Sequence, residues 1–509
     1  MRRFCPPSRL MDRLGSSRRL ICCATLMLLS GCDLAPIYHP PSMLLPEHYQ
    51  GAGPFEQARP EDQLTHGPWW QMFGDPQLNQ LEATLDAANP DLQAAQETYT
   101  QARDVVGEAR SGLFPQLNSQ AFVSENKESA HTLFHSGTAQ YQEQSNGYGA
   151  AVTWEPDFWD QIRNSTKQAQ ATAQGVAAQV ASAKLSLEIE LATYYMAIYG
   201  LDAQHAAYLQ AVDLYSTAVK ITEMRLAGKI SSGLDVQRAQ NQLSSAEAAD
   251  TDVQAQREVL VHAVAVLAGV NPVSFTLPPL THARITLPTI PVGVPSALLQ
   301  RRPDIAQAER AMAAANAAIG VSRAAFYPNI RLSAAAGFED TGFALATLPN
   351  SLWAVGASAM LPLFEGGLRK AELQSSWSQL AQAGDNYRAT VLEAFRQVED
   401  QLVLTDKLAI ESAQENTALQ AALKTQDLSM SLYTNGLDNY LNVTVAQIAA
   451  LTAQIAEVQV QTRRLQAAVA LIGAVGGGWS KADLPTEAQT APFNPLSLGS
   501  AQSDVHEPQ

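Results

Sequence analysis

The side chains best suited to catalysis or metal binding, cysteine and histidine, are few in this chain of 509 residues, which holds four Cys and nine His. The closest histidines, His131 and His135, fall in a polar stretch that we predict to be a loop, where a spacing of four has no helical meaning. We expect both histidines to be solvated loop residues, and a metal site is the alternative. The chain also lacks His-Glu-x-x-His, Gly-x-Ser-x-Gly and a phosphate-binding glycine loop. We therefore predict no enzyme, no metal and no cofactor.

One cysteine stands in a context that gives its thiol a definite chemistry. Six Arg lie among the first 19 residues, an apolar run spans residues 20–29, and Leu29-Ser30-Gly31-Cys32 follows. The apolar run is shorter than the roughly 20 residues that a spanning helix needs, so it has the form of an export signal. The four-residue ending resembles the bacterial lipobox, which predicts removal of residues 1–31 and lipid on Cys32. An ordinary cleaved signal and a buried Cys32 are the alternatives.

Cleavage at this point would change both the cysteine content and the charge of the chain. Cys5, Cys22 and Cys23 would be lost, so neither a disulfide nor a cysteine metal site could form. Loss of six Arg and one Asp would change the net charge from −16 to −21. An acidic exported protein is poorly suited to binding nucleic acid. Acyl chains could tether it to a membrane, and we find no later apolar run that indicates a spanning helix.

Long helices must position the functional residues of this chain. The stretches at about 162–227 and 368–434 contain no proline. Each holds roughly 65 residues, which is about 100 Å of helix at 1.5 Å per residue. Shorter helical stretches precede and follow each one, and two of them placed end to end match one long helix. This pattern predicts an antiparallel coiled-coil rod, in which the last helix carries a seam at spacings of three and four. The seam residues are Leu441, Thr444, Ile448, Leu451, Ile455, Val458, Thr462, Leu465, Val469 and Ile472.

Two similar junctions interrupt the helices. The segment RSGLFPQLN at 110–118 has a near-copy, RAAFYPNIR, at 323–331. The residue before a proline disfavours the helical conformation, so Pro115 and Pro328 each mark the end of a helix. After each proline, apolar residues recur with a period of two, as in a strand. We predict strands at about 116–125, 147–155, 329–339 and 351–362. Pro156 and Pro362 mark the return from strand to helix.

The strands alternate apolar with small or polar residues, as strands do whose outer face meets lipid and whose inner face meets water. A membrane admits strands only where every edge is closed, and bacterial barrels start at eight strands. Four strands from one chain cannot close. The chain is therefore predicted to oligomerise, and three copies would give twelve strands above a ring of helical strips.

Five motifs, in this order, resemble the outer membrane efflux protein family, the TolC-like channels, and especially their NodT-like lipoprotein branch. They are Trp69 to Leu78 (WWQMFGDPQL), the pairs Phe114-Pro115 and Tyr327-Pro328, Trp154 to Trp159 (WEPDFW), Leu361 to Gly367 (LPLFEGG) and Gly476 to Trp479 (GGGW). The resemblance covers essentially all of the mature chain. It implies a homotrimer with a barrel in the outer membrane and a tunnel across the periplasm. It also implies a passive exit duct that works with a periplasmic adaptor protein and an inner-membrane pump.

The resemblance also implies a gate at the helical turns, where the tunnel narrows at its periplasmic tip. Many members have two acidic residues here, at positions where this sequence has Asn442 and Val445. We expect a constriction of apolar side chains such as Leu441 and Val445, with Asp235 and Arg238 pairing across neighbouring helices. The alternative is that Val445 is merely packed and that Asp235 caps its helix.

The expected organisation of the chain follows from these motifs. Residues 1–31 are a signal peptide, 32–77 an extended lead-in, 78–272 the first repeat, 273–295 a linker, 296–475 the second repeat and 476–509 a disordered tail. Asp33 does not fit an outer-membrane lipoprotein, because in enteric bacteria an Asp after the lipidated cysteine tends to hold lipoproteins at the inner membrane. We expect barrel insertion to override this effect.

The rival function is a periplasmic coiled-coil strut without a pore. Such a strut has no use for strands.

Overall fold

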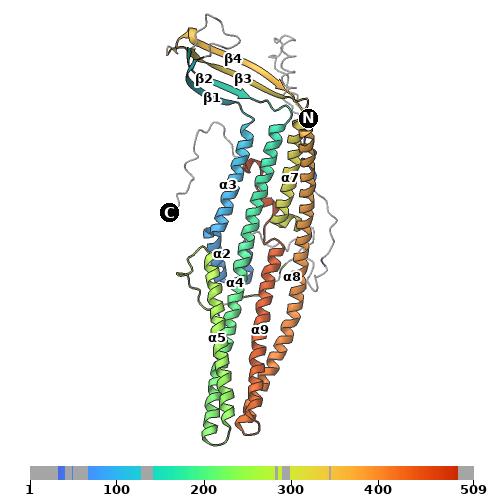
Figure 1. Ribbon diagram of the computed structural model, residues 1–509. Helices are drawn as coiled ribbons and strands as arrows, with labels where there is room; N and C mark the ends of the chain where they lie inside the picture. Colours follow the sequence, from blue (N-terminus) through green and yellow to red (C-terminus); the bar gives the residue numbers. More distant parts are fainter. Residues whose placement is uncertain are drawn as a thin grey trace, which may run out of the picture.

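The computed structural model describes residues 33–40, 49, 67–127, 142–280, 285–288, 290, 298–342 and 346–490. Figure 1 shows a long bundle of helices that carries a curved sheet at one end. The predicted signal peptide, Cys32, and the pair His131 and His135 lie outside the described residues.

Two repeats build the bundle and the sheet. The first contains α2 (Pro76–Ala88), α3 (Pro90–Ser111), β1 (Gln116–Lys127), β2 (Gln142–Trp154), α4 (Gln161–Ala227) and α5 (Gly233–Leu267). The second contains α6 (Leu298–Arg301), α7 (Pro303–Ala324), β3 (Asn329–Asp340), β4 (Ser351–Met360), α8 (Leu368–Thr434) and α9 (Tyr440–Ala474). Short elements are η1 (Trp69–Phe73), η3 (Leu348–Asn350), η4 (Lys481–Asp483) and α10 (Glu487–Thr490). The predicted fold class, long helices in two repeats with four strands, is confirmed.

The long helices α4 and α8 have 67 residues each. At 1.5 Å per residue each spans about 100 Å. Figure 1 shows α3 and α5 end to end along α4, and α7 and α9 end to end along the second long helix, α8. The short helices can restart because side chains satisfy their first N–H groups: Asn89 Oδ1 accepts from Leu92 N at the start of α3, beside Pro90.

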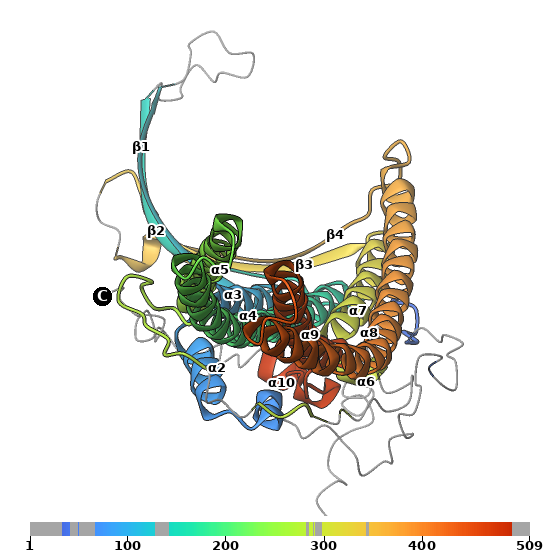
Figure 2. The ribbon, with the colours of Figure 1, turned by 90° about the horizontal axis from the view of Figure 1, so that it is seen from below.

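The four strands form one antiparallel sheet in the order β1-β2-β3-β4. Seen from below in Figure 2, the sheet forms an open arc across the end of the helical bundle. β2 begins at Gln142, five positions before the predicted start at 147, because it pairs with β1 up to Lys127↔Gln142. The polar residues of this extension have no period of two, so the sequence did not indicate it.

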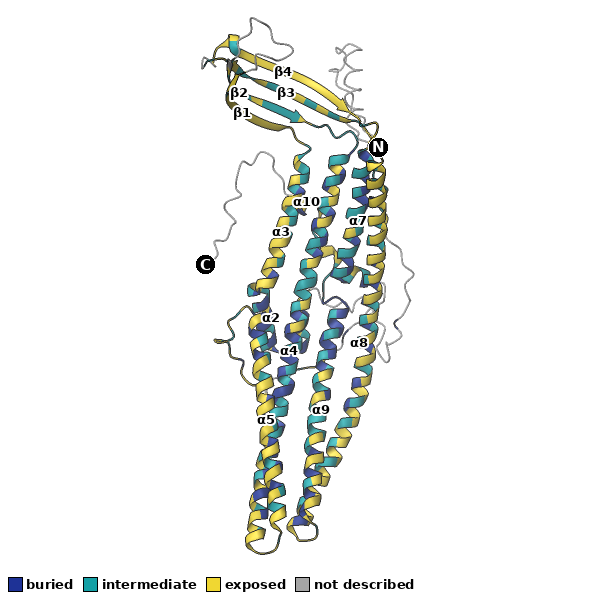
Figure 3. Ribbon diagram, in the orientation of Figure 1, coloured by how far each residue is buried: buried dark blue, intermediate teal, exposed yellow. Residues whose placement is uncertain are grey.

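The main core lies in a belt at mid-height, where η1 and α2 pack on α4. Trp69, Phe73, Leu78, Leu191 and Tyr195 are buried there. Figure 3 shows buried residues gathering in this region, while α5, α8 and β4 present exposed residues along much of their length. The predicted lead-in is therefore not wholly extended, since its aromatic end forms η1 and joins the core.

The tail is ordered further than the sequence predicted. Residues 476–490 contain η4 and α10, and η4 begins with a capping box of Ser480 and Asp483. Gln174 Nε2 on α4 donates to the carbonyl oxygen of Pro485 at 3.0 Å, and Thr490 is buried. The tail is ordered by contacts with residues far away in the sequence, and the composition of the tail itself does not indicate them. Residues 491–509 lie outside the described residues.

The predicted seam of α9 holds only near the belt. Leu465, Val469 and Ile472 are buried, but towards the turn Leu441 and Ile448 are exposed. The residues buried there are Tyr440, Val443, Ala446, Gln447 and Ala450. Near the turn, Tyr440 and Val443 thus pack against the neighbouring helices together with small and polar residues, while Leu441 and Ile448 face outward. By length and composition alone α9 could also cross a membrane, contrary to the sequence-based expectation, but it packs along α8 and α4.

Candidate functional site: the helical tip and the helix-to-strand junctions

Two tight turns form the tip at the end of the bundle opposite the sheet (Figure 1). In the turn from α4 to α5, Ser232 Oγ accepts from Leu234 N at 3.0 Å and so caps α5. In the turn from α8 to α9, Asn439 Oδ1 accepts from Asn442 N at 3.2 Å. Gly436 adopts a φ of 75°, which a residue without Cβ tolerates at low cost.

A small core joins the two hairpins just above these turns. It consists of Ala218, Val219, Ala239, Tyr433, Tyr440 and Val443, drawn from α4, α5, α8 and α9. The rings of Tyr433 and Tyr440 meet edge to face with centroids 5.3 Å apart. Arg225 of α4 donates from Nη1 to the carbonyl oxygen of Tyr433 at 3.1 Å, and its guanidinium lies 4.6 Å from the centre of that ring. The hairpin α4–α5 is therefore tied to the hairpin α8–α9.

The sequence did not single out Arg225, Tyr433 or Tyr440. The available signal was that two tyrosines flank the turn Asn435-Gly436, where a solvated turn needs no aromatic residue. The partner of Tyr433 lies 208 positions away in the chain, beyond the reach of local patterns.

The predicted gate residues lie on or near these turns. Leu441 and Val445 are 46% and 59% exposed, on a face of α9 opposite the buried Tyr440 and Val443. Asn442 Nδ2 donates to Asp438 Oδ1 at 2.7 Å, so this amide is held within its own turn. Within the described chain Val445 is therefore not packed in a core, which speaks against the alternative.

In the described chain Asp235 lies near Arg238 of its own helix, and the expected pairing across neighbouring helices stays a prediction. Arg238 Nη1 lies 4.0 Å from Asp235 Oδ1 on the same helix, because a spacing of three places both side chains on one face. Asp235 is not the cap either, since Ser232 takes that position and accepts the first hydrogen bond. Asp235 stands in the first turn of α5, where a carboxylate favours the positive end of the helix dipole.

The proline junctions lie at the other end of the bundle. Pro115 stands between α3 and β1, and Pro328 between α7 and β3. Pro156 and Pro362 stand between a strand and the long helix that follows it, α4 and α8 respectively. Phe114 and Tyr327, which precede the first two prolines, are exposed to nearly the same extent, 39% and 41%.

Tryptophan side chains connect the junctions to one another. Trp154 Nε1 donates to the carbonyl oxygen of Leu113 at 3.1 Å, and Trp159 Nε1 donates to that of Pro328 at 2.9 Å. The ring of Trp159 also stacks on Tyr327 with centroids 4.6 Å apart. Because the second bond joins the first repeat to the second, the two hairpins of the sheet start from a common base.

Asp33 is the first residue of the described chain, directly after Cys32 in sequence. Its Oδ2 accepts from Lys167 Nζ at 2.6 Å and its Oδ1 accepts from Asn164 Nδ2 at 3.1 Å, both on α4. Partial burial would raise the pKa of Asp33, but hydrogen bonds from Lys167, Ala35 and Asn164 outweigh it and hold the pKa below its usual value. Asp33 is thus an ionised residue that docks on a helix.

A buried carboxyl pair lies in the belt, which is the part of the described chain richest in perturbed acids. Burial, and then the neighbouring Glu188, raise the pKa of Glu82 to about 10, and both Glu82 oxygens lack a hydrogen-bond partner. Burial also raises the pKa of Glu188 to about 7, although Trp69 Nε1 donates to its Oε2 at 3.0 Å. Among the described residues no group of three or more His, Cys, Asp or Glu could hold a metal ion.

Comparison with known proteins matches this architecture. The model of the outer membrane efflux protein family matches residues 83–270 and 294–477. The pyoverdine export outer membrane protein OpmQ of Pseudomonas aeruginosa is 27% identical over 91% of this chain and 98% of its own length. Nodulation protein T of Rhizobium leguminosarum bv. viciae is 28% identical over 96% of this chain and 99% of its own length.

Solved structures agree with these relatives. The outer-membrane channel OprN superposes with a TM-score of 0.81 at 25% identity, over 88% of this chain and all of that one. The open state of the Neisseria gonorrhoeae MtrE outer membrane channel superposes with a TM-score of 0.78 at 25% identity, over 89% of this chain and all of that one. The chain therefore belongs to the outer membrane efflux protein family, as the outer-membrane channel component of an efflux system.

Proposed function

We propose that three copies of this chain assemble into one duct with a twelve-stranded barrel and a tunnel of twelve helical columns. The observation that carries this is the open curve of the sheet in Figure 2: β1 and β4 each have a strand partner on one side only. Unpaired N–H and C=O groups cannot remain in the hydrocarbon of a membrane, so the two edges need partners from other copies. Lipid of the outer membrane then surrounds the closed sheet.

The mass of the purified protein in detergent tests the assembly. A trimer is the expected species, and it resists dissociation by mild detergent because β1 of one copy pairs with β4 of the next. A monomer with both edges open would contradict the proposal.

The duct acts as a passive path and performs no reaction. A periplasmic adaptor and an inner-membrane pump supply the cargo and the energy, while this chain supplies a water-filled route and a gate. Relatives at 27–28% identity are named for cargo as different as pyoverdine and toluene. That range supports a wall that selects little, with the pump deciding what is exported.

The closed state of the gate is a ring of apolar side chains at the tip. Leu441 and Val445 of each copy face away from their own hairpin core and supply this ring. A narrow apolar constriction blocks ions by excluding water. Asn442, Asp235 and Arg238 surround this ring: Asn442 donates to Asp438 in its own turn, and Arg238 forms a long ion pair with Asp235 on one helix.

The proposed division of the chain follows the two repeats. The family matches at 83–270 and 294–477 support a first repeat at 78–272, a linker at 273–295 and a second repeat at 296–475. Residues 1–31 are proposed to be removed, and the thiol of Cys32 to carry lipid. Electrospray mass measurement of the N-terminal peptide tests this, because an acylated Cys32 adds the mass of its lipid and an unmodified Cys32 would contradict it.

A further inference from the structure

The described chain begins with a segment that docks along α7. Asn316 Nδ2 donates to the carbonyl oxygen of Pro36 at 2.8 Å, and Arg323 Nη1 donates to that of Leu34 at 3.0 Å. The Tyr38 hydroxyl donates to Glu309 Oε1 at 2.7 Å. Residues 33–38, called the strap below, are thus fixed in register on the helix that leads into β3.

The strap lies close to the helix because one glycine leaves room for it. A Cβ placed on Gly320 would stand 2.9 Å from the Ala35 Cβ and 2.5 Å from Asn164 Nδ2. Both distances are well inside van der Waals contact, so a larger residue would push the strap away. At its first residue the strap is locked by the ion pair of Asp33 with Lys167.

A groove opens beside the first residues of the strap. Its volume is about 460 Å³, and it is lined by Asp33, Leu34, Ala35, Arg323, Phe326, Tyr327 and Leu373. This size falls within the range of sites that hold small organic ligands. Its far wall is formed by Phe326, Tyr327 and Leu373, and the first two are more than 40% exposed.

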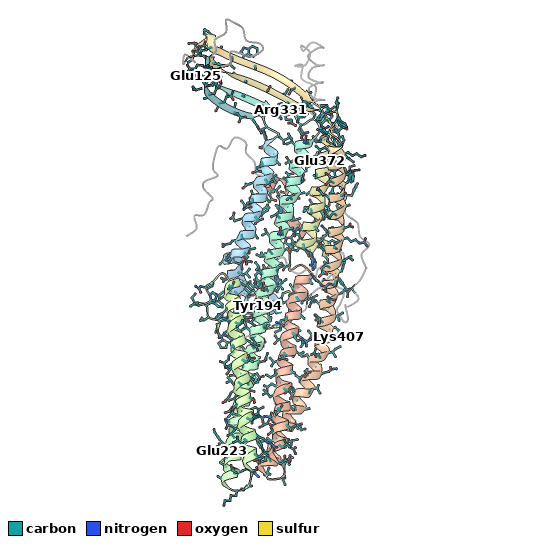
Figure 4. All side chains as sticks on the ribbon, in the orientation of Figure 1. Glu125, Tyr194, Glu223, Arg331, Glu372 and Lys407 are labelled. Atoms are coloured by element: carbon teal, nitrogen blue, oxygen red, sulfur yellow. The ribbon has the colours of Figure 1, made fainter. Side chains whose placement is uncertain are left out.

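The groove stands at the level where the tunnel meets the membrane. Phe326 and Tyr327 come directly before Pro328, and β3 begins at Asn329. Figure 4 labels Glu372, the neighbour of Leu373, near the strand end of α8. Aromatic side chains with one apolar face and one polar end favour the membrane–water interface, and Tyr327 is held there by stacking on Trp159.

We propose that this groove is the binding site for an acyl chain carried by the chain's own Cys32, which guides that chain from the strap into the outer membrane. The inference rests on the proposed lipidation of Cys32. Asp33 lines the groove and Cys32 directly precedes it in the sequence, so a lipid on Cys32 is attached one residue away from a residue of the groove.

Tethering favours this occupant over free lipid. An acyl chain attached one residue from the groove has a high effective concentration there, which a free phospholipid does not have. Arg323 holds the strap with one of its five N–H groups, which donates to the carbonyl oxygen of Leu34, and its guanidinium lies 5.4 Å from the ring centre of Trp377. The groove thus offers the acyl chain an aromatic and apolar wall at Phe326, Tyr327 and Leu373, and free phospholipid is the rival occupant that the experiment must exclude.

Photo-cross-linking in the intact outer membrane tests the site. A benzophenone side chain replaces Leu373 in full-length protein labelled with an alkyne fatty acid, and the digested product is examined by mass spectrometry. Leu363 is the matched control, because it is 91% exposed next to the end of β4 but does not line the groove. Cross-linking to the acylated N-terminal peptide should be about tenfold greater from position 373 than from position 363.

Variants of the strap test the positioning. Lys167→Met should lower the cross-linking yield from position 373, because the strap loses its first lock, whereas Lys167→Arg should retain it. An acylated peptide that cross-links equally from 363 and 373, or phospholipid alone at 373, would overturn the groove and leave lipidation intact. An unacylated peptide would overturn lipidation and the groove together, while conductance of the same sample would still report the channel separately.

Discussion

Arg225 and Tyr433 join the two halves of the tip: the guanidinium lies 4.6 Å from the ring centroid, and Nη1 donates to the Tyr433 carbonyl oxygen at 3.1 Å. Arg225 stands in the last turn of α4 and Tyr433 in the last turn of α8. The turns of the two hairpins therefore cannot separate without breaking this contact. We expect it to act as a latch on the tip.

Arg225→Met should loosen the latch. The variant loses a cation–π contact and a charge-assisted hydrogen bond, together about 1–2 kcal/mol, and so shifts the closed-to-open equilibrium roughly 5- to 30-fold. Open probability in planar bilayers measures this shift. Lys229→Met is the control, since it removes an exposed charge in the same turn. An equal effect of both substitutions would assign the result to charge rather than to the latch.

Leu441→Ser should raise the conductance of the closed channel, because a polar side chain admits water to an apolar constriction. Asp235→Ala should change it much less, since Asp235 pairs with Arg238 on its own helix. Leu392→Ser is the matched control: Leu392 is a similarly exposed leucine on α8, far from the turns in sequence. If Leu441→Ser and Asp235→Ala both left closure unchanged, the gate would lie elsewhere.

The buried acids of the belt predict a fall in stability as pH rises. The pKa values of Glu82 and Glu188 are higher in the folded chain, about 10 and about 7, than the ordinary 4.5 of a solvated Glu. Above pH 4.5 the folded state therefore holds protons that the unfolded state releases. Stability is greatest below this pH and is lost as pH rises through 7 for Glu188 and 10 for Glu82.

Glu82→Met should remove the larger part of this dependence. Each such carboxyl contributes a slope of about 1.4 kcal/mol per pH unit while it is protonated only in the fold. Thermal unfolding of helical circular dichroism at pH 5, 7 and 9 measures the slope. The variant should gain most over the natural chain at pH 9 and least at pH 5. A constant difference at all three values would contradict the raised pKa of Glu82.

Trp159→Phe should weaken the base of the sheet while it keeps an aromatic ring against Tyr327. It removes the hydrogen bond to Pro328 and leaves a carbonyl oxygen without that donor, at a cost of about 1–2 kcal/mol per chain. The temperature at which the assembled protein dissociates in detergent should fall. Trp377→Phe, on the exposed face of α8, should change it less.

The sequence predicted the features that depend on local pattern. Proline-free runs set α4 and α8, and Pro115 and Pro328 set the two changes from helix to strand. It could not predict which apolar face of α9 is buried, because Leu441 fits a seam by spacing alone while Ala446 and Gln447 take the space against neighbouring helices. Contacts between distant residues, such as Arg225 with Tyr433, have no local signature at all.

Single-channel recording of the purified protein in planar bilayers tests the central claim, that the chain forms a gated duct. The natural protein should show a small, mostly closed conductance, and the double variant Arg225→Met with Leu441→Ser should show long openings of a larger conductance. Absence of conductance in both proteins, with the trimer intact, would contradict the duct and favour a periplasmic strut.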